Sequence, residues 1–398
     1  MTTSPTTTKI EGFCAPGFEA VRDAFAAAFA AGEEVGAAVA VVVDGEPVVD
    51  LWAGHADQTR TVPWTRDTLV NVYSTTKGMT ALCAQRLADE GALDLDAPVA
   101  RYWPEFAAAG KGDVPVRWLL SHRAGLPAVR DLLPREALFD FDAMASALAA
   151  ETPWWTPGER HGYHALTFGW LVGEVVRRVA GKSLGSYFRD EVAGPLGADF
   201  HIGLDDDHHG RVAEMSPMAL PEPGSQNTDA PALAELLIRD PEGMSARAFM
   251  NPPSMAEGVN HAAWRRAEIP GANGHATARA LARIYGVLAR GGEQDGVRLL
   301  SREGIERCRE EQSRGPDAVL LLPTRIAGGF MLSQPDVPGG SFGPGEGSFG
   351  HPGAGGSVGF ADPEAGVGFG YVMNRMGPQI LIDPRASALI DALYEALE

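Results

Sequence analysis

The chain of 398 residues is 45% hydrophobic and 21% charged, which is typical of a folded globular protein and excludes an intrinsically disordered one. Its formal net charge of −19 at pH 7 disfavours nucleic acid and anionic membranes as partners, because both select basic proteins. The three cysteines, Cys14, Cys83 and Cys308, are too few and too scattered to predict a disulfide framework or a zinc site.

The first residues carry neither the basic region nor the apolar region of a secretory signal. The longest apolar run with strand character, residues 37–43, is too short to span a bilayer. We therefore expect a soluble, cytoplasmic protein with no membrane partner.

The N-terminal part alternates helix and strand signals. Apolar residues at helical spacing predict an amphipathic helix over residues 16–33. Two β-rich runs, 37–43 and 47–52, flank an Asp-Gly pair, which strongly favours a hairpin. A strand-like segment at 69–73 then leads into a predicted helix over 74–87.

The middle of the chain changes character. Helices are predicted near 115–121, 141–150, 165–180 and 183–193, and again at 276–291. Residues 205–260 are rich in proline, glycine and acidic side chains, so we expect an irregular surface segment there. The last third returns to strands at 328–332, 357–361 and 367–373 and closes with a helix over 384–397.

Strands at both ends with helices between them predict an α+β fold of the α/β/α sandwich type. One antiparallel sheet would be built from both chain ends and flanked by helices, with an all-helical inserted subdomain. We assign residues 1–94 and 271–398 to the sheet domain and 95–270 to the helical domain. The active site is expected in the cleft between them.

Lysine is rare in this chain: only Lys9, Lys77, Lys111 and Lys182 among 33 basic residues. Lys77 follows Ser74 by three positions, and residues at i and i+3 share one face of a helix. Unlike arginine, a buried lysine can lose its proton, so this pair predicts a serine nucleophile with an activating amine. The alternative is a helix-capping serine beside a solvated lysine, because Ser-x-x-Lys alone is a weak signal.

Tyr163 follows a Pro-Gly turn and precedes a predicted helix. A tyrosine near a lysine can act as a base or as a proton relay. The commoner role of an isolated tyrosine is a packed aromatic ring with a satisfied hydroxyl.

Residues 349–357 hold the third candidate element. Glycine and proline dominate this segment directly before a strand, which lets the main chain approach a ligand and offer N–H groups to an oxyanion. The alternative is an ordinary glycine-rich turn.

Taken in order, Ser74-x-x-Lys77, Tyr163 and the strand bearing His351-Pro352-Gly353 resemble the serine β-lactamase and penicillin-binding-protein superfamily. The chain is most similar to class C β-lactamases and to the family VIII carboxylesterases built on that fold. Residues 118–126 also look like a segment of this superfamily. The resemblance covers about residues 16–395 and is weakest over 200–260.

The resemblance implies roles for individual residues. Ser74 would be the acylated nucleophile, Lys77 its amine partner, and Tyr163 the tyrosine of the Tyr-x-Asn element. His351 and Gly353 would lie where β-lactamases carry Lys-Thr-Gly and would contact substrate. The backbone N–H groups of Ser74 and Ala354 would form the oxyanion hole.

Two positions depart from the β-lactamase pattern. Ala165 replaces the asparagine of Tyr-x-Asn, and His351 replaces the lysine of Lys-Thr-Gly. Losing an amide and a fixed cation should weaken recognition of a β-lactam while leaving Ser74, Lys77 and Tyr163 in place. This combination resembles the esterases.

Other residues leave alternatives open. Trp154 and Trp155 are either core side chains or one wall of an apolar acyl pocket. His122 is expected to be a structural histidine at a helix end. Gly-x-Ser-x-Gly occurs around Ser183 and Ser357, but neither has the strand-to-helix context of a nucleophile elbow.

The sequence thus predicts a serine hydrolase that cleaves carboxylic esters of small acyl groups through an acyl-enzyme on Ser74. The partner is a small-molecule ester, and no metal or organic cofactor is required. Whether Lys77 or Tyr163 is the base stays open. The alternatives are a β-lactamase, a D-amino-acid amidase or peptidase, an acyltransferase, or a binding protein with a decayed site on the same fold.

Overall fold

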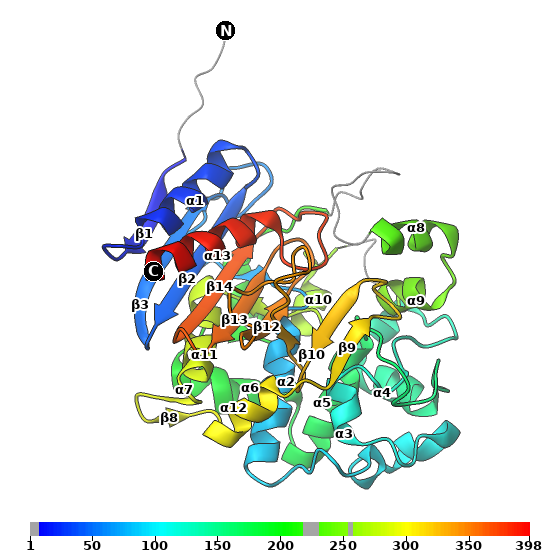
Figure 1. Cartoon of the computed structure of the whole chain (residues 1–398). Coiled ribbons are helices and arrows are strands. Elements are labelled where there is room, and N and C mark those ends of the chain that lie inside the picture. Colours follow the sequence, from blue (N-terminus) through cyan, green and yellow to red (C-terminus); the bar gives the residue numbers. More distant parts are fainter. Residues whose placement is uncertain (1–7, 218–230, 254–257) are drawn as a thin grey trace.

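In the computed structural model, which describes residues 8–217, 231–253 and 258–398, the central element is a nine-stranded antiparallel sheet. Its strand order is β1-β3-β2-β14-β13-β12-β11-β10-β9 (Figure 1). The strands are β1 (Ile10–Cys14), β2 (Gly36–Val43), β3 (Glu46–Gly54), β9 (Ser313–Pro316), β10 (Pro323–Ile326), β11 (Met331–Leu332), β12 (Phe349–Pro352), β13 (Val358–Asp362) and β14 (Val367–Met373).

The two chain ends meet where β2 pairs with β14. Their register runs from Val43 opposite Val367 to Ala37 opposite Met373. The predicted hairpin joins β2 to β3, and its turn residues Asp44 and Gly45 have φ of 49° and 88°, as two-residue hairpin turns require. The prediction of one sheet from both chain ends is confirmed.

Helices cover both faces of this sheet (Figure 1). On one face, α11 (Ala278–Ala289) packs directly on β14, since a Cβ atom at Gly368 would lie 2.2 Å from the Gly286 nitrogen. The other face carries α1 (Glu19–Ala30) and α13 (Pro384–Leu397), which contact each other. The predicted α/β/α sandwich is confirmed.

The remaining chain is mainly helical. Its α-helices are α2 (Thr76–Asp89), α3 (Val116–Leu120), α4 (Phe141–Ala150), α5 (Thr167–Ala180), α6 (Leu184–Phe188), α7 (Gly194–Leu196), α8 (Pro231–Arg239), α9 (Met244–Met250), α10 (Ala262–Arg266) and α12 (Arg302–Arg309). Short 3₁₀ and π turns are η1 (Val99–Arg101), η2 (Pro104–Gly110), η3 (Arg135–Phe139), η4 (Arg189–Ala193) and η5 (Asp206–Arg211). Among the described residues, no helix combines the length and apolar character that a membrane crossing needs.

A small sheet connects the helical segment to the chain before Ser74. Its strands are β4 (Val70–Asn71), β6 (His275–Ala276) and β5 (Phe200–His201), in that order, so the segment predicted to be all-helical also contains one two-residue strand. A separate hairpin pairs β7 (Glu293–Gln294) with β8 (Val297–Arg298).

The expected irregular segment 205–260 is partly helical. Helices α8 and α9 lie within it, so the expectation was wrong for those residues. Its composition hid them because proline and glycine flank both helices. Residues 218–230 and 254–257 lie outside the described part of the chain.

Candidate active site

Ser74 lies in a sharp turn between β4 and α2. Tyr73, just before it, has φ of 44°, a left-handed conformation that is rare for a bulky side chain and costs about 1–3 kcal/mol. The Tyr73 hydroxyl reaches the Met376 sulfur at 3.3 Å, and the Tyr73 carbonyl accepts hydrogen bonds from Thr76. The surrounding packing therefore holds a strained turn that leaves the Ser74 side chain half-buried at the start of a buried helix.

Lys77 is completely buried and contacts three oxygen atoms. Its Nζ atom lies 3.0 Å from the Ser74 Oγ atom. It also donates to the backbone carbonyls of Ala165 and Gly271, each at 2.7 Å. The sequence predicted the contact with Ser74 but gave no signal for the two carbonyls, which come from residues 88 and 194 positions away.

Burial lowers the pKa of Lys77 well below its usual value of 10.5. Within the described residues no carboxylate forms an ion pair with this amine. A buried ammonium without a counter-ion is expensive, so the site favours the neutral amine, which can accept a proton.

Tyr163 contacts both Lys77 and Ser74. Its ring centroid lies 4.7 Å from the Lys77 Nζ atom. Burial raises the pKa of the Tyr163 hydroxyl, while its hydrogen bond with the Ser74 side chain lowers that pKa. The structure therefore brings Ser74, Lys77 and Tyr163 together. The hydroxyl itself stays protonated near neutral pH, a state suited to donating or relaying a proton.

Asp317 fixes the main chain at Tyr163. One carboxylate oxygen of this buried residue accepts the N–H groups of Tyr163, Val319 and Leu320 at 3.0, 2.8 and 2.8 Å. Sequence reasoning missed Asp317, because it lies 154 residues from Tyr163 and no local motif marks it.

His122 serves as a structural residue beside Tyr163. Its Nδ1 atom accepts the His164 N–H at 3.0 Å, and its carbonyl accepts the Gly162 N–H at 3.1 Å. Burial is the main reason that its pKa lies well below 6.5, with nearby His164 and Lys77 acting in the same direction. These contacts agree with the backbone-satisfied histidine expected from the sequence.

His351 lies on β12 with its ring centroid 5.9 Å from that of Tyr163. Its Nδ1 atom is 2.6 Å from the Pro352 carbonyl, which requires a proton on Nδ1. Burial lowers its pKa to about 3. His351 therefore contributes no fixed positive charge at neutral pH, unlike a lysine at this position.

The glycine-rich segment after β12 packs against the residues that flank Ser74. A Cβ atom at Gly353 would lie 2.3 Å from the Val72 carbonyl and 2.9 Å from the Thr75 Oγ1 atom. The Ser357 hydroxyl donates to the same Val72 carbonyl at 2.8 Å and lies 3.1 Å from Thr75 Oγ1. Only glycine permits this approach at position 353.

Two backbone N–H groups remain available here. Among the hydrogen bonds of the described residues, neither the Ser74 N–H nor the Ala354 N–H acts as a donor. Unused N–H groups beside a nucleophile are the chemical requirement for an oxyanion hole.

The two tryptophans differ in their surroundings. Trp154 donates its indole N–H to the Ala128 carbonyl at 2.8 Å and stacks with Arg130. Trp155 is buried, and its ring lies 6.0 Å from that of His164. These contacts explain both residues by packing; a role in an acyl pocket stays a prediction.

The other two candidate serines have structural contacts. Ser183 caps α6 and donates to Glu268 at 2.6 Å. Ser357 donates to Val72 as described above. Neither serine lies on a strand-to-helix turn, as expected from the sequence.

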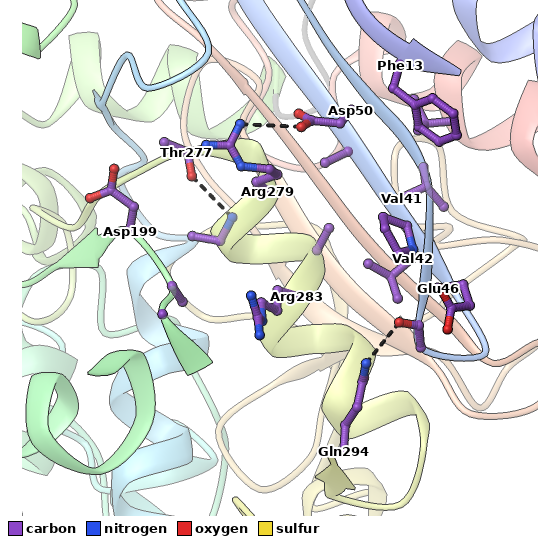
Figure 2. A pocket seen from close by; sticks show the side chains of 18 of the residues that line it. Phe13, Val41, Val42, Glu46, Asp50, Asp199, Thr277, Arg279, Arg283 and Gln294 are labelled. Atoms are coloured by element: carbon purple, nitrogen blue, oxygen red, sulfur yellow. Dashed lines mark hydrogen bonds and ion pairs between the residues drawn. The ribbon is translucent and has the colours of Figure 1, made fainter. Parts of the chain in front are cut away.

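A pocket of about 570 Å³ is lined by residues of α11 and of the β2–β3 hairpin. Figure 2 shows the side chains that line it. Arg279 forms an ion pair with Asp50 at its wall, and Gln294 bonds the Gly45 carbonyl. None of the predicted site residues lines this pocket. Among the described residues, no group of three or more His, Cys, Asp or Glu side chains could hold a metal ion.

An antiparallel sheet from both chain ends, with a Ser-x-x-Lys pair at the start of a buried helix, defines the serine β-lactamase-like class of proteins. The chain belongs to the beta-lactamase family, because the family model described as Beta-lactamase matches residues 21–392. The resemblance inferred from its motifs is thereby confirmed.

Individual relatives are similar over nearly the whole chain. Esterase/beta-lactamase LipL of Mycobacterium tuberculosis is 43% identical over 382 residues, which are 94% of this chain and 85% of LipL. The solved structure of a family VIII carboxylesterase has a TM-score of 0.89 at 46% identity and covers 98% of this chain and 100% of its own. A penicillin-binding protein homologue from Caulobacter crescentus gives a TM-score of 0.88 at 45% identity, with 98% and 100% covered.

Proposed function

We propose that the protein is a serine hydrolase that cleaves carboxylic esters of small acyl groups through an acyl-enzyme on Ser74. The observation that carries this proposal is the 3.0 Å contact between the Ser74 Oγ atom and the amine of Lys77. Burial lowers the pKa of this amine and so favours its neutral form. A serine hydroxyl becomes a useful nucleophile only when a nearby base can take its proton.

In the proposed mechanism, Lys77 takes the proton from Ser74 as Oγ attacks the ester carbonyl. The N–H groups of Ser74 and Ala354 stabilise the resulting oxyanion, and each such donor is worth about 3 kcal/mol. The proton taken up by Lys77 passes through the Tyr163 hydroxyl, which is hydrogen-bonded to Ser74, to the leaving alcohol, so that Lys77 is neutral and Tyr163 is protonated again. Water then attacks the acyl-enzyme by the same steps, which releases the acid and restores Ser74.

Two features favour an ester over a β-lactam as substrate. Residue 165 is an alanine that contacts Lys77 only through its backbone carbonyl, and it has no side-chain amide to bind the amide group of a β-lactam. His351 is neutral at working pH and supplies no cation for a β-lactam carboxylate. The similarity to a family VIII carboxylesterase supports the same choice, whereas the name of LipL covers both esterase and β-lactamase activity.

The helical segment 95–270 contributes Tyr163 and Ala165, and the two sheet segments contribute Ser74, Lys77 and His351. We propose that the substrate enters between these parts, and the domain division at residues 94 and 270 stays a prediction. Trp154, Trp155, His351 and Gly353 are the proposed substrate-binding residues.

The test is hydrolysis of p-nitrophenyl acetate by the native protein, by Ser74→Ala and by Ser183→Ala. We expect native and Ser183→Ala proteins to turn over the ester and Ser74→Ala to be inactive. Intact-mass measurement after rapid acid quench should show an added acetyl group only when Ser74 is present. Ester turnover that survives Ser74→Ala contradicts the proposal.

Rival activities need their own substrates. Nitrocefin tests the β-lactamase alternative, a D-amino-acid amide tests the amidase, and an added alcohol acceptor tests acyl transfer. If kcat/KM is higher for nitrocefin or for the amide than for the ester, the proposed substrate class is wrong. A chain-length series from acetate to decanoate tests the preference for small acyl groups.

A further inference from the structure

Arg385, at the start of α13, is the centre of a buried hydrogen-bond network. Only 7% of its side chain is exposed. Its guanidinium binds two buried carboxylates, with Nε–Oδ1 of 2.8 Å to Asp383 and Nη1–Oε2 of 3.1 Å to Glu34. Glu34 is also hydrogen-bonded by the Tyr371 hydroxyl.

The same guanidinium also binds three backbone carbonyls from separate loops. These are Glu33 at 3.3 Å, Arg375 at 3.0 Å and Gly355 at 2.9 Å. Arginine offers five N–H donors in a rigid plane, so one side chain fixes several segments in a single geometry.

Gly355 is the contact that matters for chemistry, because it directly follows Ala354. Its φ is 85°, and Gly356 has φ of 136°, conformations that L-residues rarely adopt. Glycine restricts its own backbone least, so contacts must hold this loop. Within it, Gly356 donates its N–H to the Gly353 carbonyl at 3.0 Å. From outside, Arg385 binds the Gly355 carbonyl at 2.9 Å, and Gly377 donates its N–H to that same carbonyl at 2.9 Å.

The opposite side of this loop touches the nucleophile segment. Gly353 packs on Val72 and Thr75, and the Met376 side chain lies between Gly355 and the Tyr73 hydroxyl. The loop is thus confined between the residues around Ser74 and the guanidinium of Arg385. A shift of Gly355 would move the peptide N–H of Ala354 relative to Ser74.

We propose that Arg385 is a positioning residue that holds the Gly353–Gly356 loop. In this position the Ala354 N–H points at the oxyanion that forms when Ser74 attacks the ester carbonyl. This inference rests on the proposed esterase function. Arg385 touches no reacting atom; it acts through the Gly355 carbonyl. Its two carboxylate partners fix the guanidinium, so that the loop is held by a group that is itself immobile.

The test uses Arg385→Met and Arg385→Lys in the full chain with p-nitrophenyl acetate. A misplaced oxyanion donor weakens the transition state more than the ground state, so kcat should fall by about 10²-fold in Arg385→Met while KM changes by less than about threefold. Phenylboronic acid forms a tetrahedral adduct with an active serine, and its affinity should fall in parallel with kcat/KM. Lysine keeps the charge but not the planar fork, so Arg385→Lys should show the same pattern with a smaller loss.

Arg325→Met is the matched control for losing a buried arginine. The Arg325 side chain is 13% exposed and binds Glu311 and the Ser333 carbonyl, away from the loop. It should lower thermal stability without lowering kcat. Hydrogen exchange at residues 353–356 should accelerate in the Arg385 variants and not in this control.

If Arg385→Met does not fold, the same measurements are made on Arg385→Lys. A folded Arg385 variant with kcat and boronate affinity within twofold of the native values overturns the inference. This result is distinct from failure of the proposed function, in which Ser74→Ala itself would retain ester turnover. A rise in KM alone would assign Arg385 to substrate binding and would also overturn the inference.

Discussion

The Nζ atom of Lys77 lies 3.0 Å from the Oγ atom of Ser74, and its two other hydrogen bonds go to uncharged backbone carbonyls. Neutral acceptors orient the amine without stabilising its protonated form as a carboxylate would. The buried setting thus keeps Lys77 both fixed in space and ready to accept a proton.

The first prediction concerns this proton transfer. Lys77→Met should lower kcat/KM for p-nitrophenyl acetate by about 10²–10⁴-fold, the usual contribution of a general base. Lys77→Arg should be equally inactive, because a guanidinium stays protonated. Lys182→Met is the control, since Lys182 pairs with Asp190 and Glu191 outside the site and its loss should leave kcat/KM unchanged. Substantial activity in Lys77→Arg would show that this amine is not the base.

A second prediction follows from the lowered pKa of Lys77. In the unfolded chain this lysine titrates near 10.5, whereas in the folded protein it binds its proton less tightly. Between the two pKa values the unfolded state binds more protons, so the free energy of unfolding rises with pH by up to about 1.4 kcal/mol per unit. Lys77→Met removes this contribution.

Urea denaturation of both proteins between pH 7 and pH 10 measures the effect. The stability of the native protein relative to Lys77→Met should increase as pH rises through this window. A constant difference would mean that the amine of Lys77 remains charged in the folded protein throughout.

Local sequence signals identified the proposed nucleophile, its amine partner and the tyrosine, because each stands in a short pattern. Lys77 follows Ser74 by one helical turn, and Tyr163 follows a Pro-Gly turn. The sheet was predictable for a similar reason: its β-branched runs and the Asp-Gly hairpin are local.

The groups that hold these residues in place were not predictable. Gly271 and Ala165 act through their backbone carbonyls, and any residue type supplies a carbonyl. Arg385 and Asp317 act across more than 20 intervening residues, through loops whose approach depends on the whole fold. Helices α8 and α9 were missed because their flanking prolines and glycines outweighed a short helical period.

The third prediction tests the contact between α11 and the sheet. Gly368→Ala should lower the free energy of unfolding by about 1–3 kcal/mol, because its Cβ would lie 2.2 Å from the Gly286 nitrogen and 2.4 Å from the Ala282 carbonyl. Both are main-chain atoms, so no side chain can move aside. Gly112→Ala is the matched control, since a Cβ there meets nothing within 4 Å. Equal unfolding midpoints for the two variants would refute this packing argument.

The last prediction concerns Asp317, which supports Tyr163 from behind. Replacing it with alanine leaves the N–H groups of Tyr163, Val319 and Leu320 buried without their acceptor. Each unpaired buried donor costs about 1–3 kcal/mol, so Asp317→Ala should be strongly destabilised. Asp317→Asn retains an oxygen that can accept the same three bonds and should lose much less.

Activity measurements distinguish a role of Asp317 in positioning Tyr163 from a role in stability alone. If Asp317 positions the phenol, kcat per folded molecule should fall by about tenfold in Asp317→Ala at a temperature where the variant is fully folded, because misplacing a proton relay costs part of its 10²–10⁴-fold contribution. KM should change little, since Asp317 faces the backbone of Tyr163 and not the substrate. A folded Asp317→Ala variant with native kcat would mean that the Tyr163 hydroxyl keeps its place through its contacts with Ser74 and Lys77 alone.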